Sequence, residues 1–379
     1  MRVFHTADVH VGLKFTRGYS EALQQELVAE RVAVVSRMAD LANQEQCDLF
    51  VVAGDLFDSV RVSKASIRAT AEALTRFEGL VAVLPGNHDY LQETDDPLWP
   101  TFADALGEGH LLLRQQQPYD LSGWDLPAIL YPGVCTSKHS SENAVGWIAD
   151  AIDSEATDKI RLGIAHGSLD GLSPDFNKDY FPMTTAELER IDVHAWLLGH
   201  THVRFPDVDA GRDGRLFYPA TPEPDGFDCR HGGYAWLIDI TPGGQLDYRS
   251  LPTGTFRFRN LDPQQLAECE LRSETDFQAL RKLFEGFRSG RELVKLKLGG
   301  RLDRELFDQL GSLREQLDAC VEHLEFDDTE VLRAVRQDDI DTEFTQDSFP
   351  HRLLSELAGP DGNPLALQLA YETIQEARQ

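Results

Sequence analysis

Seven side chains of the kinds that bind divalent cations occur in five short polar motifs within the first 202 residues. They are Asp8, His10, Asp55, Asn87, His166, His200 and His202. Two carboxylates, one amide and four imidazoles, without a thiolate, suit Mn²⁺ best, with Fe²⁺ second, rather than a structural zinc ion. Two such ions allow hydroxide to attack a phosphodiester near neutral pH. The motifs therefore predict a two-metal hydrolytic site.

Each motif follows a short apolar run that is typical of a buried parallel strand. The runs cover residues 3–4, 49–53, 81–84, 162–164 and 196–198. Ligands of an open α/β sheet gather at the carboxyl ends of its strands. We therefore expect the five motifs to meet in one crevice.

Spacing suggests how the seven side chains divide between two ions. Residues two apart on an extended segment face the same side, which applies to Asp8 with His10 and to His200 with His202. A carboxylate such as Asp55 can bridge two cations through its two oxygens. We expect one ion at Asp8, His10, Asp55 and His202, and the other at Asp55, Asn87, His166 and His200. The roles of His200 and His202 could be exchanged.

Three further residues of the same motifs could act in catalysis. His88 follows Asn87 directly and is not needed as a ligand, so it could protonate the leaving oxygen as a general acid. Asp89 could orient His88. Asp58 could orient either His88 or a metal ligand.

Cationic and aromatic residues on the loops that leave these motifs could contact substrate. The cationic candidates are Lys14, Arg17, Arg61, Lys64 and Lys178. The aromatic candidates for base stacking are Trp99, Phe102, Phe176, Tyr180 and Phe181. The alternatives are that the cations are solvated surface residues and that the aromatic rings pack on the core.

The order of apolar and polar segments predicts an α/β fold with central sheets flanked by helices. Long helices are expected at 20–46 and 63–77, and strands return at 216–240. We expect a catalytic domain at 1–255, a small α+β cap domain at 256–335, and an acidic linker with a helical tail at 336–379. The tail has apolar residues at 349–357 and 365–374, which could dock on a partner or pack on the chain's own core.

Composition limits the classes of protein to consider. The 379 residues carry 36 Lys and Arg against 64 Asp and Glu, a net charge of -28, which is unusual for a nucleic-acid binder acting alone. Five separated cysteines form no C-x-x-C pair, so a disulfide framework is not expected. Without a signal peptide or a long apolar span, we expect a cytoplasmic protein that does not interact with membranes.

The five motifs resemble those of the calcineurin-like metallophosphoesterase superfamily. The opening segment 5–12 and the segment 218–223 resemble its DNA repair exonuclease branch, which includes SbcD-type nuclease subunits and the YhaO group. Ala220 and Thr221 stand where Gly-Ser is usual, and Asp58 matches the bacterial members. The resemblance implies a four-layer αββα sandwich, Mn²⁺-dependent exonuclease and endonuclease action on DNA, and a coiled-coil SMC-like ATPase partner. No phosphate-binding G-x-x-x-x-G-K-[ST] motif occurs in this chain.

Three functions are consistent with these observations. The first is a DNA exonuclease or endonuclease subunit of an SbcCD-like or YhaO-like repair complex. The second is a phosphoesterase that acts on cyclic nucleotides, nucleotides or phosphoproteins, which the acidic composition favours. The third is a non-enzymatic scaffold for the ATPase, which the complete ligand set opposes. A homodimer is left open.

Overall fold

The computed structural model describes residues 1–16, 18–92, 97–153, 158–207, 214–287, 290–359 and 362–378. It divides the chain into two compact units, Met1–Phe258 and Arg259–Gln379. The first boundary lies three residues after the expected end of the catalytic domain. The expected cap and tail both belong to the second unit.

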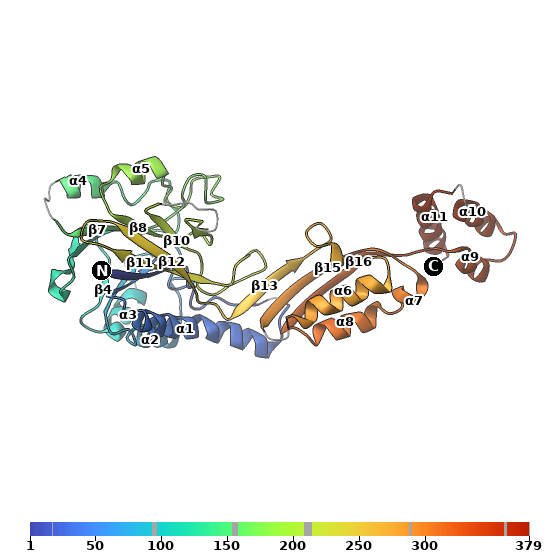
Figure 1. The fold of residues 1–379 in the computed structure, drawn as a ribbon, viewed down its shortest axis with the longest axis horizontal. Coiled ribbons are helices and arrows are strands. Elements are labelled where there is room, and N and C mark those ends of the chain that lie inside the picture. Colours follow the sequence, from blue (N-terminus) through green and yellow to red (C-terminus); the bar gives the residue numbers. More distant parts are fainter. Residues whose placement is uncertain are drawn as a thin grey trace. The chain divides into compact units, whose positions relative to one another are not determined.

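Two six-stranded sheets form the centre of the first unit (Figure 1). The first sheet has the order β12 (Leu246–Pro252), β11 (Tyr234–Ile240), β1 (Arg2–Thr6), β2 (Leu49–Ala53), β3 (Leu80–Leu84) and β4 (Leu111–Leu112). The second has the order β5 (Tyr119–Asp120), β6 (Ala128–Gly133), β7 (Ile160–His166), β8 (Ala195–Gly199), β10 (Leu216–Pro219) and β9 (Arg204–Phe205).

The strands that precede the polar motifs run parallel to their neighbours. In the first sheet β1, β2 and β3 are parallel in register, with Val3 opposite Leu49 and Leu49 opposite Leu80. In the second sheet β7 is parallel to β8, with His166 opposite Gly199. The loops that follow these strands therefore leave each sheet at one edge, as the sequence predicts.

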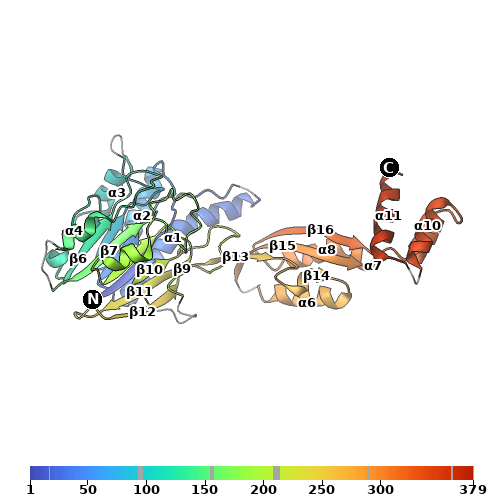
Figure 2. The same cartoon turned by 90° about the horizontal axis from the view of Figure 1, so that it is seen from above.

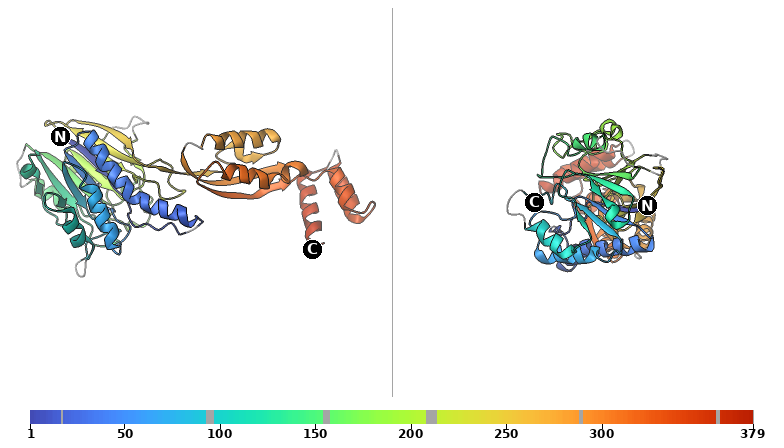
Figure 3. Two further views of the ribbon diagram at one scale, coloured as in Figure 1. Left: turned by 90° about the horizontal axis from the view of Figure 1, so that it is seen from below. Right: turned by 90° about the vertical axis from the view of Figure 1, so that its left-hand side faces the viewer.

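The two sheets pack face to face, and helices cover their outer faces. Alternate residues of β2 show the division: Leu49, Val51 and Ala53 belong to the core between the sheets, whereas Phe50 and Val52 pack toward α1. Helices α1 (Glu21–Gln44), α2 (Lys64–Leu74) and α3 (Leu98–Leu106) cover the first sheet. Helices α4 (Trp147–Asp153) and α5 (Thr185–Arg190) cover the second (Figure 3). The four-layer αββα arrangement is confirmed.

Serine residues begin the two long helices of the first layer. The Ser20 hydroxyl accepts a hydrogen bond from the Leu23 amide, and Ser63 accepts one from Ser66. Helix α2 ends at Leu74, three residues before the expected end. A 3₁₀ turn at Leu121–Trp124 lies between β5 and β6.

The second unit holds a four-stranded sheet with helices on one face (Figure 2). Its strands are β13 (Phe256–Leu261), β14 (Glu270–Leu271), β15 (Arg291–Leu302) and β16 (His323–Arg333), and β15 pairs with the other three. The helices are α6 (Glu274–Glu285), α7 (Arg304–Phe307) and α8 (Leu310–Asp318), with a 3₁₀ turn at Ala267–Cys269. The α+β composition expected for this part of the chain is observed.

The last residues form a small cluster of three helices. These are α9 (Gln337–Glu343), α10 (Phe349–Ala358) and α11 (Pro364–Glu376). The expectation of an acidic linker here is wrong, because Ile340 and Phe344 lie four residues apart and are buried against Leu354 and Tyr371. The prediction failed because the acidic residues of α9 dominate the composition of this segment, so the two apolar residues that form its buried face were not recognised.

Within the described residues, no helix combines the length and apolarity that crossing a membrane requires. All five cysteines are free, and four of them are buried.

Candidate metal centre

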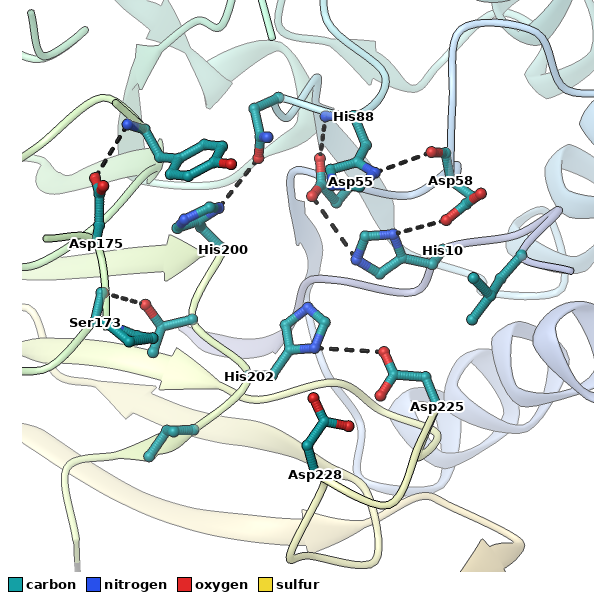
Figure 4. Close-up of a pocket in the computed structure, with 16 residues that line it drawn as sticks. His10, Asp55, Asp58, His88, Ser173, Asp175, His200, His202, Asp225 and Asp228 are labelled. Atoms are coloured by element: carbon teal, nitrogen blue, oxygen red, sulfur yellow. Dashed lines mark hydrogen bonds and ion pairs between the residues drawn. The ribbon is translucent and has the colours of Figure 1, made fainter. Parts of the chain in front are cut away.

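The loops at the carboxyl ends of the strands bring the seven candidate ligands together, and Figure 4 shows His10, Asp55, His200 and His202 among them. Asp8 and His10 follow β1, Asp55 follows β2 and His200 follows β8. All four have left-handed backbone conformations, with φ of 56°, 52°, 50° and 97° respectively. Such conformations cost a non-glycine residue about 1–3 kcal/mol and persist where the surrounding structure holds them. The backbone is thus bent at the points where ligand side chains must turn inward.

Glycines beside the ligands leave room for close approach of the loops. A Cβ atom on Gly54, which has φ of 89°, would lie 2.1 Å from the His166 Nδ1 atom. A Cβ on Gly86 would lie 2.2 Å from the Asp55 Oδ1 atom. Any side chain at these positions would displace a candidate ligand.

A cavity of about 590 Å³ opens over this edge of the first unit. It is lined by His10, Leu13, Asp55, Asp58, Asn87, His88, Ser173, Pro174, Asp175, Tyr180, His200, Thr201, His202, Val203, Asp225 and Asp228. Five of these residues are aspartates, and no lysine or arginine of the described chain lines the cavity. An anionic substrate would therefore depend on bound cations for favourable electrostatics.

One group of donor atoms lies around His10. Its Nε2 atom is 3.8 Å from Asp55 Oδ2, and the Nε2 atom of His202 is 3.7 Å from Asp8 Oδ1. Ligand atoms of Asp8, His10 and His202 all lie within 4.8 Å of one another. This group matches the expected first ion.

A second group lies around Asn87. Its Oδ1 atom is 3.0 Å from His166 Nε2 and 3.1 Å from His200 Nδ1. His166 Nε2 is also 3.1 Å from Asp55 Oδ2. Asp55 is thus close to both groups, as expected of a bridging carboxylate.

The residues present fit a pair of divalent cations. The buried Nε2 atom of His10 has no hydrogen-bond partner among the described residues, which is costly for a polar atom unless something binds there. Burial disfavours a charge on His166, but Asp55 outweighs it and raises the pKa of His166 to about 9. Burial likewise opposes a charge on His202, but Asp225 and Asp8 raise its pKa to about 9. A cation that enters the site must displace these protons.

Three of the four imidazoles have an outer partner that fixes the ring. The Nδ1 atom of His166 donates to the Ala53 carbonyl oxygen at 2.8 Å. The Nδ1 atom of His10 lies 3.6 Å from Asp58 Oδ1, and that of His202 lies 3.4 Å from Asp225 Oδ2. In each case Nε2 is left for the site, which is the arrangement common around metal-bound histidine.

The contacts of His88 and Asp58 fit the roles expected of them, whereas those of Asp89 do not. His88 lines the cavity, and its Nδ1–H donates to the Asp58 carbonyl oxygen at 3.0 Å, so Nε2 is free for proton transfer. Asp58 therefore contacts both His88 and His10. The expectation that Asp89 orients His88 is wrong. Its buried carboxylate accepts hydrogen bonds from the backbone amides of Phe57 and Gly86, which ties two loops together.

None of the four described cationic candidates lines the cavity. Lys14, Arg61, Lys64 and Lys178 are exposed. Lys178 lies 4.0 Å from Asp170, and Lys64 lines a separate depression with Arg68 and Asp104. Arg17 lies outside the described residues. Nearness in sequence to a site motif thus did not place these side chains at the site, and their expected substrate contacts find no support in the structure.

The aromatic candidates divide between core and surface. Trp99, Phe102 and Phe181 are buried. Tyr180 lines the cavity with its ring 5.0 Å from that of His200, and Phe176 is 94% exposed. Only Tyr180 and Phe176 are therefore available to a substrate.

Sequence reasoning missed three cavity aspartates. Asp175 accepts hydrogen bonds from Ser168 Oγ and from the Tyr180 amide, and so holds the loop that carries Tyr180. Asp225 and Asp228 belong to a segment that directly follows the resemblance at 218–223. Extending that segment would have been the available signal, because both aspartates lie within five residues of its end.

The match to a known family agrees with this geometry. Residues 1–204, more than half of the chain, match the calcineurin-like phosphoesterase family. The chain belongs to this family. The matched residues include all seven candidate ligands and His88.

Two curated proteins are similar in sequence to this phosphoesterase over part of their length. It is 28% identical over 259 residues to the protein of Bacillus subtilis (strain 168) named uncharacterized metallophosphoesterase YhaO. This alignment covers 63% of this chain and 57% of the relative. It is 23% identical over 233 residues to the SbcD subunit of the SbcCD nuclease of Staphylococcus epidermidis, which covers 54% of this chain and 58% of the relative. The aligned part of this chain thus spans less than two thirds of either relative.

Two solved structures are also similar to this phosphoesterase. A protein of Thermus thermophilus gives a TM-score of 0.40 at 11% identity, covering 65% of this chain and 97% of the other. A dimetal phosphatase from Danio rerio gives a TM-score of 0.37 at 11% identity, covering 67% and 99%.

Proposed function

We propose that this chain is a two-metal phosphodiesterase that cleaves DNA as the nuclease subunit of an SbcCD-like or YhaO-like complex. The observation that carries the proposal is the meeting of seven oxygen and nitrogen ligands beside His88. Five of them line the same cavity as His88, and ligand atoms of the buried Asp8 and His166 lie within 4.8 Å of Asp55. Polar groups buried at this density without compensation would be strongly destabilising. Bound cations and a phosphoester substrate would supply the compensating interactions for these buried polar groups.

The proposed ligands divide as the distances suggest. Asp8, His10, Asp55 and His202 would hold one ion, and Asp55, Asn87, His166 and His200 would hold the other. Mn²⁺ is the expected metal and Fe²⁺ the alternative, since the set mixes nitrogen with oxygen and has no thiolate.

The chain's own residues supply the rest of the reaction. Two divalent cations, when bound, activate water and stabilise the charge on the phosphate. His88 holds a proton on Nδ1 through its bond to the Asp58 carbonyl oxygen and delivers the proton on Nε2 to the leaving oxygen. Asp58 also holds His10 through its carboxylate. The rings of Tyr180 and His200, which line the cavity, would orient the part of the substrate that is attached to the phosphate.

Support for DNA as the substrate comes from the named nuclease relative and not from surface charge. The aspartates of the cavity rim and the net charge of -28 oppose a long polyanion. We therefore expect weak, salt-sensitive DNA binding by the isolated chain, with affinity supplied by the ATPase partner.

The acidic rim favours a second candidate function. A substrate with one phosphate, such as a cyclic nucleotide, a nucleotide or a phosphoprotein, would place fewer charges against Asp175 and Asp228. Its metal site and general acid would be the same.

A cleavage assay separates the two functions. We expect the full chain loaded with Mn²⁺ to shorten end-labelled single- and double-stranded DNA, and to lose this activity in EDTA. His88→Gln protein purified in parallel controls for contaminating nucleases. Hydrolysis of cyclic nucleotides or phosphopeptides without any cleavage of DNA would instead support the second candidate.

The helical cluster α9–α11 is the proposed attachment point for the coiled-coil ATPase. Its own core accounts for Leu354, Leu367 and Tyr371. Leu365 and Leu369, one turn apart on α11, remain 70% and 65% exposed, and Phe349 on α10 is 74% exposed. Apolar residues four apart are the pattern by which a helix packs on another helix.

Replacing Leu365 and Leu369 together by serine should abolish co-purification with a co-expressed coiled-coil ATPase. Hydrolysis of bis(p-nitrophenyl) phosphate and the melting temperature should stay as in the wild type, because both side chains are already solvated. Leu367→Ser is the matched control on the same helix, since Leu367 is 7% exposed and its loss should lower stability. An ATPase that still binds the double variant would contradict docking through α11.

A further inference from the structure

One nitrogen of His202 is directed toward an acid that no sequence motif includes. The ring lies between two carboxylates, with Nε2 3.7 Å from Asp8 Oδ1 and Nδ1 3.4 Å from Asp225 Oδ2. Figure 4 shows the contact with Asp225. Asp8 is fully buried, and the Asp225 side chain is 17% exposed. His202 thus presents one nitrogen to the metal site while the other faces Asp225.

We infer that Asp225 is the positioning residue of His202, and that the segment 221–231 is built to hold it there. This inference rests on the proposed role of His202 as a metal ligand. Asp225 would keep the Nδ1–H tautomer, so that Nε2 remains an electron-pair donor, and would fix the ring plane. Asp58 stands in the same relation to His10.

The segment is fixed before Asp225 by buried contacts. Arg31 is fully buried on α1, and its guanidinium donates to the carbonyl oxygens of Glu223 at 2.8 Å and Pro224 at 3.0 Å. The Glu223 carboxylate accepts hydrogen bonds from the Thr255 and Phe256 amides, both at 2.7 Å. These contacts leave the backbone at Asp225 little freedom.

The same segment is fixed after Asp225 by His231. Its Nδ1 atom accepts a hydrogen bond from the Gly233 amide at 3.1 Å, so the ring proton is on Nε2. That Nε2–H lies 3.1 Å from the carbonyl oxygen of His202. One segment therefore holds His202 at two places, its ring through Asp225 and its backbone through His231.

Arg31 also connects the segment to the first motif. The guanidinium Nη1 atom lies 3.4 Å from the carbonyl oxygen of Val9, the residue between Asp8 and His10. The loop that carries Asp225 and the loop that carries two ligands of the same proposed ion thus share one buried cation. Their relative positions are set without the metal.

Isothermal titration of the metal-free full chain with Mn²⁺ tests the inference. We expect Asp225→Asn and Asp225→Ala to bind one of the two ions about 10–100-fold more weakly, the usual effect of losing an outer carboxylate. Asp225→Glu should recover part of the affinity. Asp228→Asn is the matched control, because Asp228 lines the same cavity and carries the same charge, yet no contact with His202 is found within the described residues.

The two asparagine variants distinguish a specific role of Asp225 from a general effect of negative charge. Equal losses in Asp225→Asn and Asp228→Asn would show a general effect of negative charge and overturn the inference, as would wild-type affinity in Asp225→Ala. Metal-free Asp225→Asn should still unfold in one cooperative transition, and loss of that transition would show that Asp225 is merely structural. A wild-type chain that binds no ions would overturn the proposed function as well.

Discussion

Replacing His88 by glutamine should lower the rate of DNA cleavage by about 10²–10⁴-fold while both metal ions stay bound. That range is the usual contribution of general acid–base catalysis. The His88 backbone amide donates to Asp55 Oδ1 at 2.9 Å and is unchanged in the variant, and the His88 ring packs edge-on against the ring of His10, where the glutamine side chain would take its place. Metal analysis should therefore give the same stoichiometry for both proteins.

The leaving group distinguishes an acid from a structural residue. A nucleotide leaves as an alkoxide and needs a proton, whereas p-nitrophenolate is stable without one. The loss caused by His88→Gln should thus be much smaller with bis(p-nitrophenyl) phosphate than with DNA. The same loss with both substrates would assign His88 to substrate positioning, and wild-type cleavage of DNA would show that His88 takes no part.

Replacing Asp55 by asparagine should remove metal binding and activity together. The Asp55 carboxylate is 2% exposed and lies near donor atoms of both groups, within 3.1 Å of His166 and 3.8 Å of His10. The neighbouring imidazoles overcome the effect of burial and lower its pKa, so it carries a full negative charge in the site. An amide at this position offers one oxygen without that charge and cannot bridge two cations.

Metal-dependent stability provides a readout that is independent of activity. A ligand that binds only the folded chain stabilises it according to its concentration and affinity. Mn²⁺ should raise the melting temperature of the wild type and of Asp228→Asn, and should leave that of Asp55→Asn unchanged. If Asp55→Asn keeps both ions, Asp55 does not bridge them.

Much of the centre could be predicted because local sequence determines it. Asp8, Asp55, Asn87, His166 and His200 each follow a short apolar run within four residues, and parallel strands bring such positions to one edge. The runs also predicted sheets flanked by helices, whereas the four-layer arrangement was implied by the family resemblance; in the structure β2 buries alternate side chains on its two faces. These properties depend on neighbours within a few residues.

Other features depend on contacts between distant segments, and only the tertiary structure decided them. Asp225 reaches His202 because Arg31, almost two hundred residues earlier in the chain, holds its loop. Asp89 follows His88 directly but bonds to the backbone of Phe57, and Lys64 follows a site motif but faces solvent. A side chain's direction is set by the backbone that surrounds it in space, so motif spacing can place a residue near a site without telling what it contacts.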